Sequence, residues 1–253
     1  MNTGLNTALT RRRALTMLAV TVGGSIVLPR TLLAQASSLL LPGIDVCTLV
    51  PEVTEGPYYF DPTLVRADIT EGKDGLPLTL RMQVVDAACA PIENARVDIW
   101  HCDAAGVYSG YANQTAGVDT TGQTFLRGTL FTDARGLVEF STIYPGWYVG
   151  RTTHIHFKVF LDESNVLTGQ IFFDEAVNAA VYASVPAYAR STTRTLFNDN
   201  DGIAQQAGAA SIAAVDQTAA TYVAALIVGV DPNATSAGGA MGPGGMPPGG
   251  PPR

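Results

Sequence analysis

The residues of this sequence best suited to chemistry are two histidines one residue apart, His154 and His156. They stand in the stretch GWYVGRTTHIHFKVF, in which Tyr148 and Arg151 precede them. In a β-strand, residues i and i+2 point to the same face, so the two imidazoles would project side by side while Ile155 points to the opposite layer. Taken alone, such a pair is about as often structural as metal-binding, and the stretch leaves both alternatives open.

Two tyrosines extend this pair to a possible ligand set. Tyr108 ends DIWHCDAAGVY, where an expected strand gives way to a glycine-containing loop, and such loops often hold sites. Tyr148 stands six residues before His154, across the Gly150 bend, so its phenol can return to the same region. A phenolate is a strongly donating anionic oxygen, and with two imidazoles it suits ferric iron better than zinc. Arg151 would add a fixed cation beside that centre.

Each of these residues also has a simpler interpretation when taken singly. A lone tyrosine is usually half-buried with a hydrogen-bonded hydroxyl, and a lone arginine usually forms a surface ion pair. His101 has no partner in the pattern and is expected to be structural, and Trp100 and Trp147 are expected to be core residues. Tyr58 and Tyr59 are expected to be core residues, with packing near the mouth of the site as the alternative. Only the joint pattern favours a metal site.

The elements that must position these residues are mostly short strands. LPLTLRMQVVDA (76–87) alternates with period two, and ARVDIWHCD (95–103) follows after a turn. Further strands are expected in TFLRGTLFTDARGLVEFSTIYPGWY, THIHFKVFLD, LTGQIFFD and the run that starts at Tyr222, and a short helix in EAVNAAVYASVPAYA. Many short strands with little helix predict an all-β fold, an antiparallel β-sandwich with long loops and few short helices.

The two ends of the chain are expected to lie outside this domain. Residues 1–36 hold a basic cluster at Arg11–Arg13, a short apolar run and an Ala-Gln-Ala end, which predicts a signal peptide of the twin-arginine type and export to the periplasm or the outside. The apolar run is too short for a spanning helix, so no membrane span is expected after cleavage, although a retained anchor is an alternative. The domain is expected over 37–235, and the Gly- and Pro-rich tail 236–253 is expected to be disordered.

Charge and cysteine usage narrow the function classes. Removal of residues 1–36, which hold four arginines and no acidic residue, would move the formal net charge from −7 to about −11. Such an acidic protein is a poor candidate for binding nucleic acid. Among the three cysteines, Cys47 and Cys89 lie in turn-like, Pro-flanked sequence and are expected to form a disulfide, while Cys102 is expected to be a buried free thiol. Their spacing argues against a structural zinc site.

Several blocks of the sequence resemble one enzyme family. DIWHCDAAGVYSGY, FSTIYPGWY and RTTHIHFKV, in this order between about residues 47 and 232, resemble the signature blocks of the intradiol ring-cleavage dioxygenases. PEVTEGPYY and TIYPGWY resemble the short, exported branch. The resemblance implies a non-haem Fe³⁺ enzyme that inserts both atoms of O₂ into a catechol-type aromatic. The ring would open between the two hydroxyls to a cis,cis-muconate-type product, with catechol and O₂ as the small-molecule partners.

The resemblance also implies a role for each site residue. Tyr108 and His154 would be equatorial ligands, and Tyr148 and His156 the axial pair. Tyr148 would leave the iron and accept a proton when substrate binds. Arg151 would stabilise negative charge that develops on the ring, and Gln170 would lie near the substrate.

The sequence departs from better-known members in two respects. Thr152-Thr153 stands where these enzymes often have Pro-Ala, which is expected to matter little to metal binding. The long helical N-terminal region of the catechol-specific enzymes is also missing, so the substrate and the oligomeric state stay open, a homodimer included. Two alternatives remain at this stage: an exported β-sandwich binding module with a degenerate site, and a different metal such as copper in the same His and Tyr set.

Overall fold

The computed structural model describes residues 48–61, 63–114, 117–162, 165–217 and 221–233. The predicted signal peptide, the predicted tail and Cys47 lie outside these residues, so the Cys47–Cys89 disulfide stays a prediction. Cys102 is a buried free thiol, as expected. Within the described ranges, no helix is both long and apolar enough to span a bilayer.

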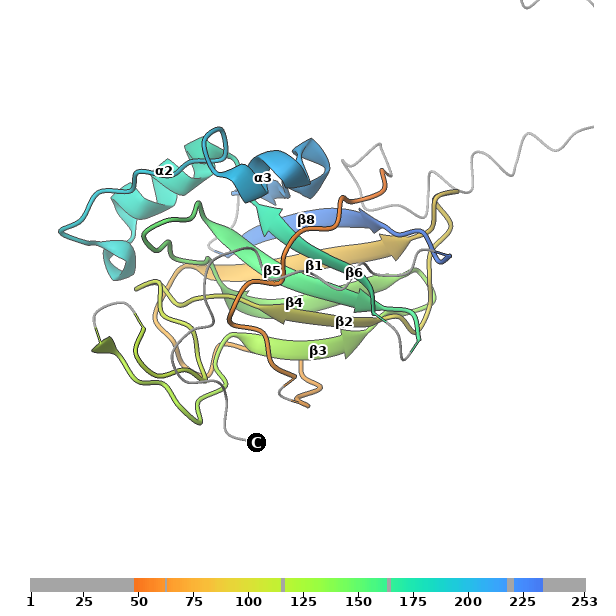
Figure 1. Ribbon diagram of the computed structural model, residues 1–253, viewed down its shortest axis with the longest axis horizontal. Coiled ribbons are helices and arrows are strands. Elements are labelled where there is room, and N and C mark those ends of the chain that lie inside the picture. Colours follow the sequence, from red (N-terminus) through yellow and green to blue (C-terminus); the bar gives the residue numbers. More distant parts are fainter. Residues whose placement is uncertain (1–47, 62, 115–116, 163–164, 218–220, 234–253) are drawn as a thin grey trace, which may run out of the picture.

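Two four-stranded sheets pack face to face and confirm the predicted β-sandwich (Figure 1). The first sheet has the order β4 (Leu137–Ile143), β1 (Pro77–Val85), β8 (Tyr222–Gly229), β7 (Ala214–Asp216). The second has the order β3 (Arg127–Phe131), β2 (Arg96–Trp100), β5 (His154–Phe160), β6 (Asn165–Phe172). All neighbouring pairs are antiparallel except β1 and β8, which are parallel. A parallel pair needs a long connection, and here the whole second sheet lies between the two strands.

The helices within the described residues are short and follow β6. The expected helix is α2 (Glu175–Ser184), which begins after Asp174, whose side chain accepts a hydrogen bond from the Ala176 N–H. A second helix, α3 (Gly202–Ala207), was not predicted; Asp201 caps its start. Two single-turn 3₁₀ helices, η2 (Pro186–Tyr188) and η3 (Ala209–Ser211), complete this part of the chain.

Strand β5 has two different faces, as the alternation predicts. Ile155, Phe157 and Val159 are fully buried in the core between the two sheets. The other face presents His154 and His156, which are also buried. A sheet with one face on the core normally leaves the other face in solvent, so something else must cover this face.

The cover is the irregular segment 48–61, which runs across the second sheet (Figure 1). Val53 N–H donates to the Thr168 carbonyl at 3.0 Å, and the Thr54 carbonyl accepts from Gln170 Nε2 at 2.9 Å. Further along, the Tyr59 hydroxyl donates to the Asp98 carboxylate at 2.9 Å. This segment therefore buries the face that carries the two histidines.

Candidate metal centre

Four side-chain atoms from three separate segments meet at the end of the second sheet. His154 Nε2 lies 3.3 Å from Tyr108 Oη, 3.3 Å from Tyr148 Oη and 3.0 Å from His156 Nε2. His156 Nε2 lies 3.2 Å from Tyr108 Oη. The structure thus brings together all four residues that the sequence singles out as a ligand set.

The spacing of these atoms matches what a single metal ion requires. Two ligand atoms that each lie about 2.0–2.1 Å from an ion and subtend 90–120° at it are about 2.8–3.6 Å apart. Among the described residues, no group of three or more His, Cys, Asp or Glu side chains could hold a metal ion, so the site exists only by virtue of its tyrosines. Two imidazoles with two phenols form a set suited to ferric iron. The residues present fit that ion.

The protonation of His154 is set by its backbone neighbour. His154 Nδ1 lies 2.7 Å from the Thr152 carbonyl, which can only accept, so Nδ1 carries the proton and Nε2 presents its lone pair to the site. Burial, with the nearby Arg151 cation, lowers the pKa of His154 well below its usual value. Burial and the neighbouring His154 do the same to the pKa of His156. Both imidazoles are therefore neutral and able to act as ligands.

The pKa values of the two phenols are shifted upward, whereas those of the two imidazoles are shifted downward. Burial raises the pKa of Tyr108 well above 10, and the adjacent Tyr148 raises it further. Burial also raises the pKa of Tyr148 to about 12, although Arg151 opposes this. In the protein alone both tyrosines are neutral, and a trivalent cation at the four donor atoms would supply the positive charge that their ionisation needs.

Tyr108 and Tyr148 meet because the loops that hold them touch through their backbones. Gly146 N–H donates to the Asp103 carbonyl at 3.2 Å, and a Cβ at Gly146 would lie 2.4 Å from that oxygen. At Gly106, which has a φ of +80°, a Cβ would lie 2.3 Å from the Trp147 carbonyl oxygen. Only glycine allows this approach at either position.

Gly146→Ala is therefore expected to destabilise the protein by about 1–3 kcal/mol, the usual range for overpacking. It should also weaken iron retention, because Tyr148 would be displaced from Tyr108. Chemical unfolding of the iron-free protein and iron content after purification would measure the two effects. Gly202→Ala is the matched control, because a Cβ at Gly202 would have no atom within 4 Å and Gly202 is the first residue of helix α3. Equal behaviour of the two variants would contradict this account of the loops.

Aromatic rings hold two of the four donor side chains in place. Tyr58 stacks on Tyr108 with ring centroids 4.3 Å apart and planes 14° apart. Trp100 stacks on His156 with centroids 4.9 Å apart and planes 9° apart. Both rings are thus packing residues, as expected, but they pack against the ligands themselves. Neither of these two stacking contacts was predicted from the sequence.

Arg151 lies beside the donor atoms and is fixed by two partners. Its Nη2 donates to Gln170 Oε1 at 2.6 Å, and its Nε donates to Asp201 Oδ2 at 2.8 Å. Gln170 is fully buried and stands directly opposite His156 in the β5–β6 pair. The two residues predicted to face the substrate are therefore in contact. Asp201 is a third member of this group, and sequence reasoning missed it.

His101 takes no part in the site. Its Nδ1 donates to the Cys102 carbonyl at 2.8 Å, and its Nε2 lies 2.8 Å from the Thr142 hydroxyl. Burial lowers the pKa of His101 to about 4. Its structural role, expected from the sequence, is to link the end of β2 to β4.

Comparison with known proteins bears on the family of this chain. A family model described as "Dioxygenase" matches residues 54–205, more than half of the chain. The structure of an intradiol ring-cleavage dioxygenase from Tetranychus urticae is 34% identical and superposes with a TM-score of 0.69 over 76% of this chain and 98% of that one. The chain belongs to the intradiol ring-cleavage dioxygenase family.

Curated members of the family match a smaller part of the chain. Catechol 1,2-dioxygenase from Acinetobacter baylyi is 32% identical over 155 residues, which are 51% of this chain and 47% of that protein. The protocatechuate 3,4-dioxygenase beta chain from Burkholderia cepacia is 35% identical over 122 residues, which are 42% of this chain and 51% of that protein. The chain thus spans about half the length of the curated relatives that it matches.

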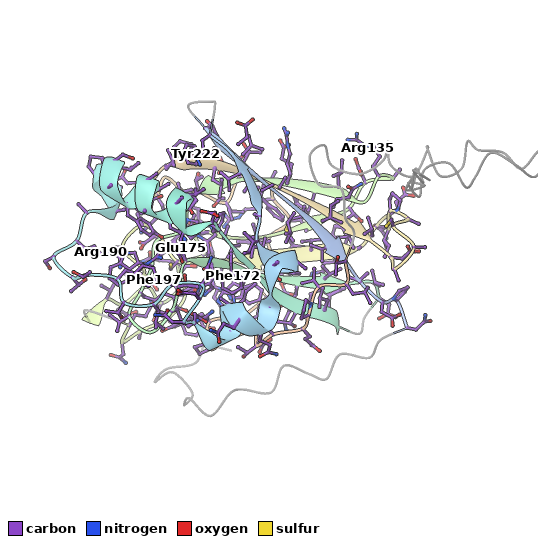
Figure 2. All side chains as sticks on the ribbon, turned by 90° about the horizontal axis from the view of Figure 1, so that it is seen from above. Arg135, Phe172, Glu175, Arg190, Phe197 and Tyr222 are labelled. Carbon is purple, nitrogen blue, oxygen red and sulfur yellow. The ribbon has the colours of Figure 1, made fainter. Side chains whose placement is uncertain are left out.

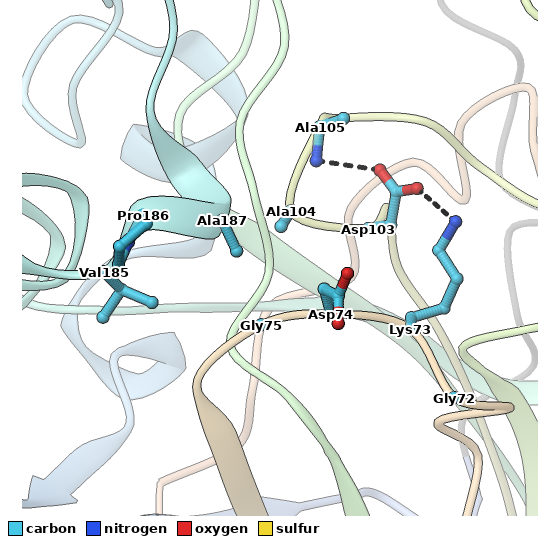
Figure 3. A pocket seen from close by; sticks show the side chains of 10 residues that line it. All are labelled: Gly72, Lys73, Asp74, Gly75, Asp103, Ala104, Ala105, Val185, Pro186 and Ala187. Carbon is cyan, nitrogen blue, oxygen red and sulfur yellow. Dashed lines mark hydrogen bonds and ion pairs between the residues drawn. The ribbon is translucent and has the colours of Figure 1, made fainter.

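A pocket of about 740 Å³ lies away from the four donor atoms, between the 72–75 loop, the 103–105 turn and the start of η2 (Figure 3). Lys73 forms an ion pair with Asp103 there at 2.7 Å, and the Ala105 N–H donates to the other oxygen of the same carboxylate at 2.9 Å. These contacts satisfy the charged groups and shape the turn that leads to Tyr108. The pocket contains none of the predicted site residues.

Proposed function

We propose that this protein is a ferric intradiol dioxygenase that opens a catechol-type ring between its two hydroxyls with O₂, giving a cis,cis-muconate-type product. The observation that carries the proposal is the set of four donor atoms, two phenol oxygens and two imidazole nitrogens, each of which lies 3.0–3.3 Å from at least one of the others. Tyr108, Tyr148, His154 and His156 would hold the iron. When bound, the iron supplies Lewis-acid activation of the substrate and orients it for reaction with O₂.

Tyr148 is the ligand with room to move. Tyr108 is 1% exposed and stacked on Tyr58, whereas Tyr148 is only partly buried and is followed by Val149, which is 72% exposed. In the protein alone the pKa of Tyr148 is about 12, because burial disfavours its charge. A Tyr148 phenolate displaced by substrate would therefore take up a proton at Oη. We assign it the role of base for a catechol hydroxyl.

Arg151 and Gln170 would act on the substrate side of the site. The guanidinium of Arg151 is a fixed positive charge that can stabilise negative charge developing on the ring. Gln170 holds one end of that guanidinium and is itself anchored to the Thr54 carbonyl. Both would orient substrate within a mostly buried site, where electrostatic effects are stronger than in water.

The test combines iron analysis with oxygen uptake. The purified protein is expected to hold about one iron per chain and to be red-brown through phenolate-to-iron charge transfer. A panel of catechol, protocatechuate, hydroxyquinol and larger catechols should give oxygen uptake with at least one member, and mass analysis should find product that has gained both oxygen atoms. A colourless protein without iron or oxygen uptake would reject the proposal in favour of a binding module. Stoichiometric copper would reject the ferric assignment alone.

The N-terminal pattern supports a second proposal, which concerns the cellular location. We propose export by a twin-arginine-type route. The arginines at 11–13, which precede an apolar run, support this proposal. This route moves folded proteins, which suits a protein that binds iron before export. Fractionation of cells that express the full chain should find the protein outside the cytoplasm, and Arg12→Lys with Arg13→Lys should retain it inside. Mature protein found only in the cytosol would contradict this.

A further inference from the structure

Asp201 is a buried carboxylate that joins three parts of the site. It is 2% exposed and lies just before α3. Its Oδ2 accepts from Arg151 Nε at 2.8 Å and from the Thr152 N–H at 2.9 Å. Its Oδ1 accepts from the Ile203 and Ala204 N–H groups at 2.9 and 3.1 Å. One carboxylate oxygen therefore caps helix α3, and the other binds Arg151 and the Thr152 N–H.

We propose that Asp201 is a positioning residue for ring cleavage, which holds Arg151 against the site and fixes the backbone of Thr152, whose carbonyl orients His154. The inference rests on the proposed function, since it assigns Asp201 to that same reaction. Asp201 itself does not touch the four donor atoms. It acts through the two residues on either side of one peptide bond.

The first arm of this arrangement concerns Arg151. An arginine side chain has several rotatable bonds, and ordering it costs entropy unless its donors are held. Asp201 engages Nε and Gln170 engages Nη2, so two separate donors of the guanidinium are held by two different partners. Although burial raises the pKa of Asp201, the Arg151 charge and the backbone donors outweigh it and hold that pKa below its usual value. The carboxylate is therefore charged near neutral pH.

The second role of Asp201 concerns the backbone of Thr152. The Thr152 N–H donates to Asp201, and the Thr152 carbonyl accepts the Nδ1 proton of His154 at 2.7 Å. The Thr152 hydroxyl also lies 3.0 Å from Asn198 Oδ1 and 3.3 Å from Glu175 Oε1. Glu175 stands at the start of α2, at the same end of the molecule as Phe172 and Phe197 and away from Arg135 (Figure 2). The segment before His154 is thus held from both helices.

The competing interpretation is that Asp201 only caps α3. Serine caps helix starts about as well as aspartate, but it is too short and has no charge to hold Arg151 as well. Asp201→Ser therefore separates the two roles, while Asp201→Asn keeps the shape and removes the charge. Asp174→Asn is the matched control, because Asp174 caps α2 through the Ala176 N–H and is exposed.

In the iron-loaded enzyme, Asp201→Ser and Asp201→Asn are expected to lower kcat about 10- to 100-fold. Asp201→Asn, which keeps an oxygen for the Thr152 N–H, should hold iron and colour close to those of the parent, whereas Asp201→Ser should hold less iron. Asp174→Asn should leave kcat within about twofold. Combined with Arg151→Gln, Asp201→Asn should add less than about twofold to the loss that Arg151→Gln causes alone, because both changes disable the same group. Losses that multiply, or an Asp201→Ser variant with full kcat, would overturn the proposal.

A second readout needs neither iron nor activity. In the iron-free protein, the ¹H–¹⁵N signal of Arg151 Nε–H, assigned by its loss in Arg151→Gln, should be protected from solvent exchange. Protection should be lost in Asp201→Ser and kept in Asp174→Asn. An unchanged signal in Asp201→Ser would overturn the proposal even in a fully folded variant. If the parent protein neither binds iron nor consumes oxygen, the proposed function fails, and this signal still decides whether Asp201 holds Arg151.

Discussion

Tyr108→Phe is expected to yield a colourless protein without measurable ring cleavage. The change removes one oxygen donor and leaves a buried ring of nearly the same shape, still stacked on Tyr58. Loss of an outer-shell partner alone typically weakens metal binding about 10- to 100-fold, so loss of a ligand should weaken it by more than about 100-fold. Iron content, the visible spectrum and oxygen uptake with the preferred catechol are the three measurements.

The matched control for this variant is Tyr111→Phe. Tyr111 is a buried tyrosine in the same loop, and its hydroxyl donates to the Tyr59 carbonyl at 3.0 Å rather than facing the donor atoms. It is expected to lose about 1 kcal/mol of stability, as for a single hydrogen bond, and to keep its iron and its colour. If Tyr108→Phe kept both colour and turnover, the ligand set proposed for the iron would be wrong.

Tyr148→Phe is expected to weaken iron binding less than Tyr108→Phe does. Tyr148 is the less buried of the two donors and is the one expected to leave the iron during the reaction. Its loss should shift the charge-transfer colour and lower kcat, while iron content falls less than in Tyr108→Phe. Titration of iron into both iron-free variants would compare them. A Tyr148→Phe variant that binds iron more weakly than Tyr108→Phe would contradict the assigned roles.

The sequence predicted the strands, and the shared face of His154 and His156, because both depend on local patterns. Alternation of apolar and polar residues sets the faces of a strand, and in β5 it placed His154 and His156 together without any knowledge of the rest of the fold. Tyr108 could be added only through the order and spacing of the blocks, since no local rule says that its loop returns to β5. The parallel pairing of β1 with β8 was equally beyond local patterns, because it joins residues more than a hundred positions apart.

The surroundings of the site were missed for the same reason. The segment 48–61 has no periodicity, and its role as a cover depends on single hydrogen bonds to β6 and β2. Asp201 gives one local signal, an acidic residue before a short alanine-rich run, and that signal predicts a helix cap rather than a partner for a residue fifty positions earlier. Side chains that act at a distance in sequence are visible only once the fold brings them together.

Thr152 shows how a departure from the family pattern can matter. Replacement of Pro by Thr at this position was expected to have little effect on metal binding, and the carbonyl that orients His154 is indeed present in any residue. The backbone N–H that donates to Asp201 would be absent if this residue were proline, because proline has no backbone N–H. The bond between Asp201 and this peptide is therefore a feature that the Thr-Thr sequence permits.

The iron-free protein is expected to lose stability steeply as the pH falls below about 6.5. The chain has three histidines, and all three are buried with a lowered pKa, that of His101 at about 4. Between the unfolded value of about 6.5 and the folded value, the unfolded chain binds a proton that the folded chain does not. Stability therefore rises with pH in this window and falls on acidification, by about 1.4 kcal/mol per pH unit for each histidine.

His101 alone should thus lower the free energy of unfolding by about 3 kcal/mol between pH 6.5 and pH 4, and the two histidines of the site should add to this. Asp201, whose pKa is lowered in the fold, acts in the same direction only at the acidic end of the range. Between pH 6.5 and 5.5 the histidines therefore dominate, and urea unfolding at half-unit steps would isolate them. Since His101 lies outside the ligand set, His154→Gln with His156→Gln should reduce the slope without abolishing it. A free energy of unfolding that stays constant from pH 6.5 to 5 would mean that the histidines are accessible to protons in the folded protein, and the buried, neutral ligand pair would have to be abandoned.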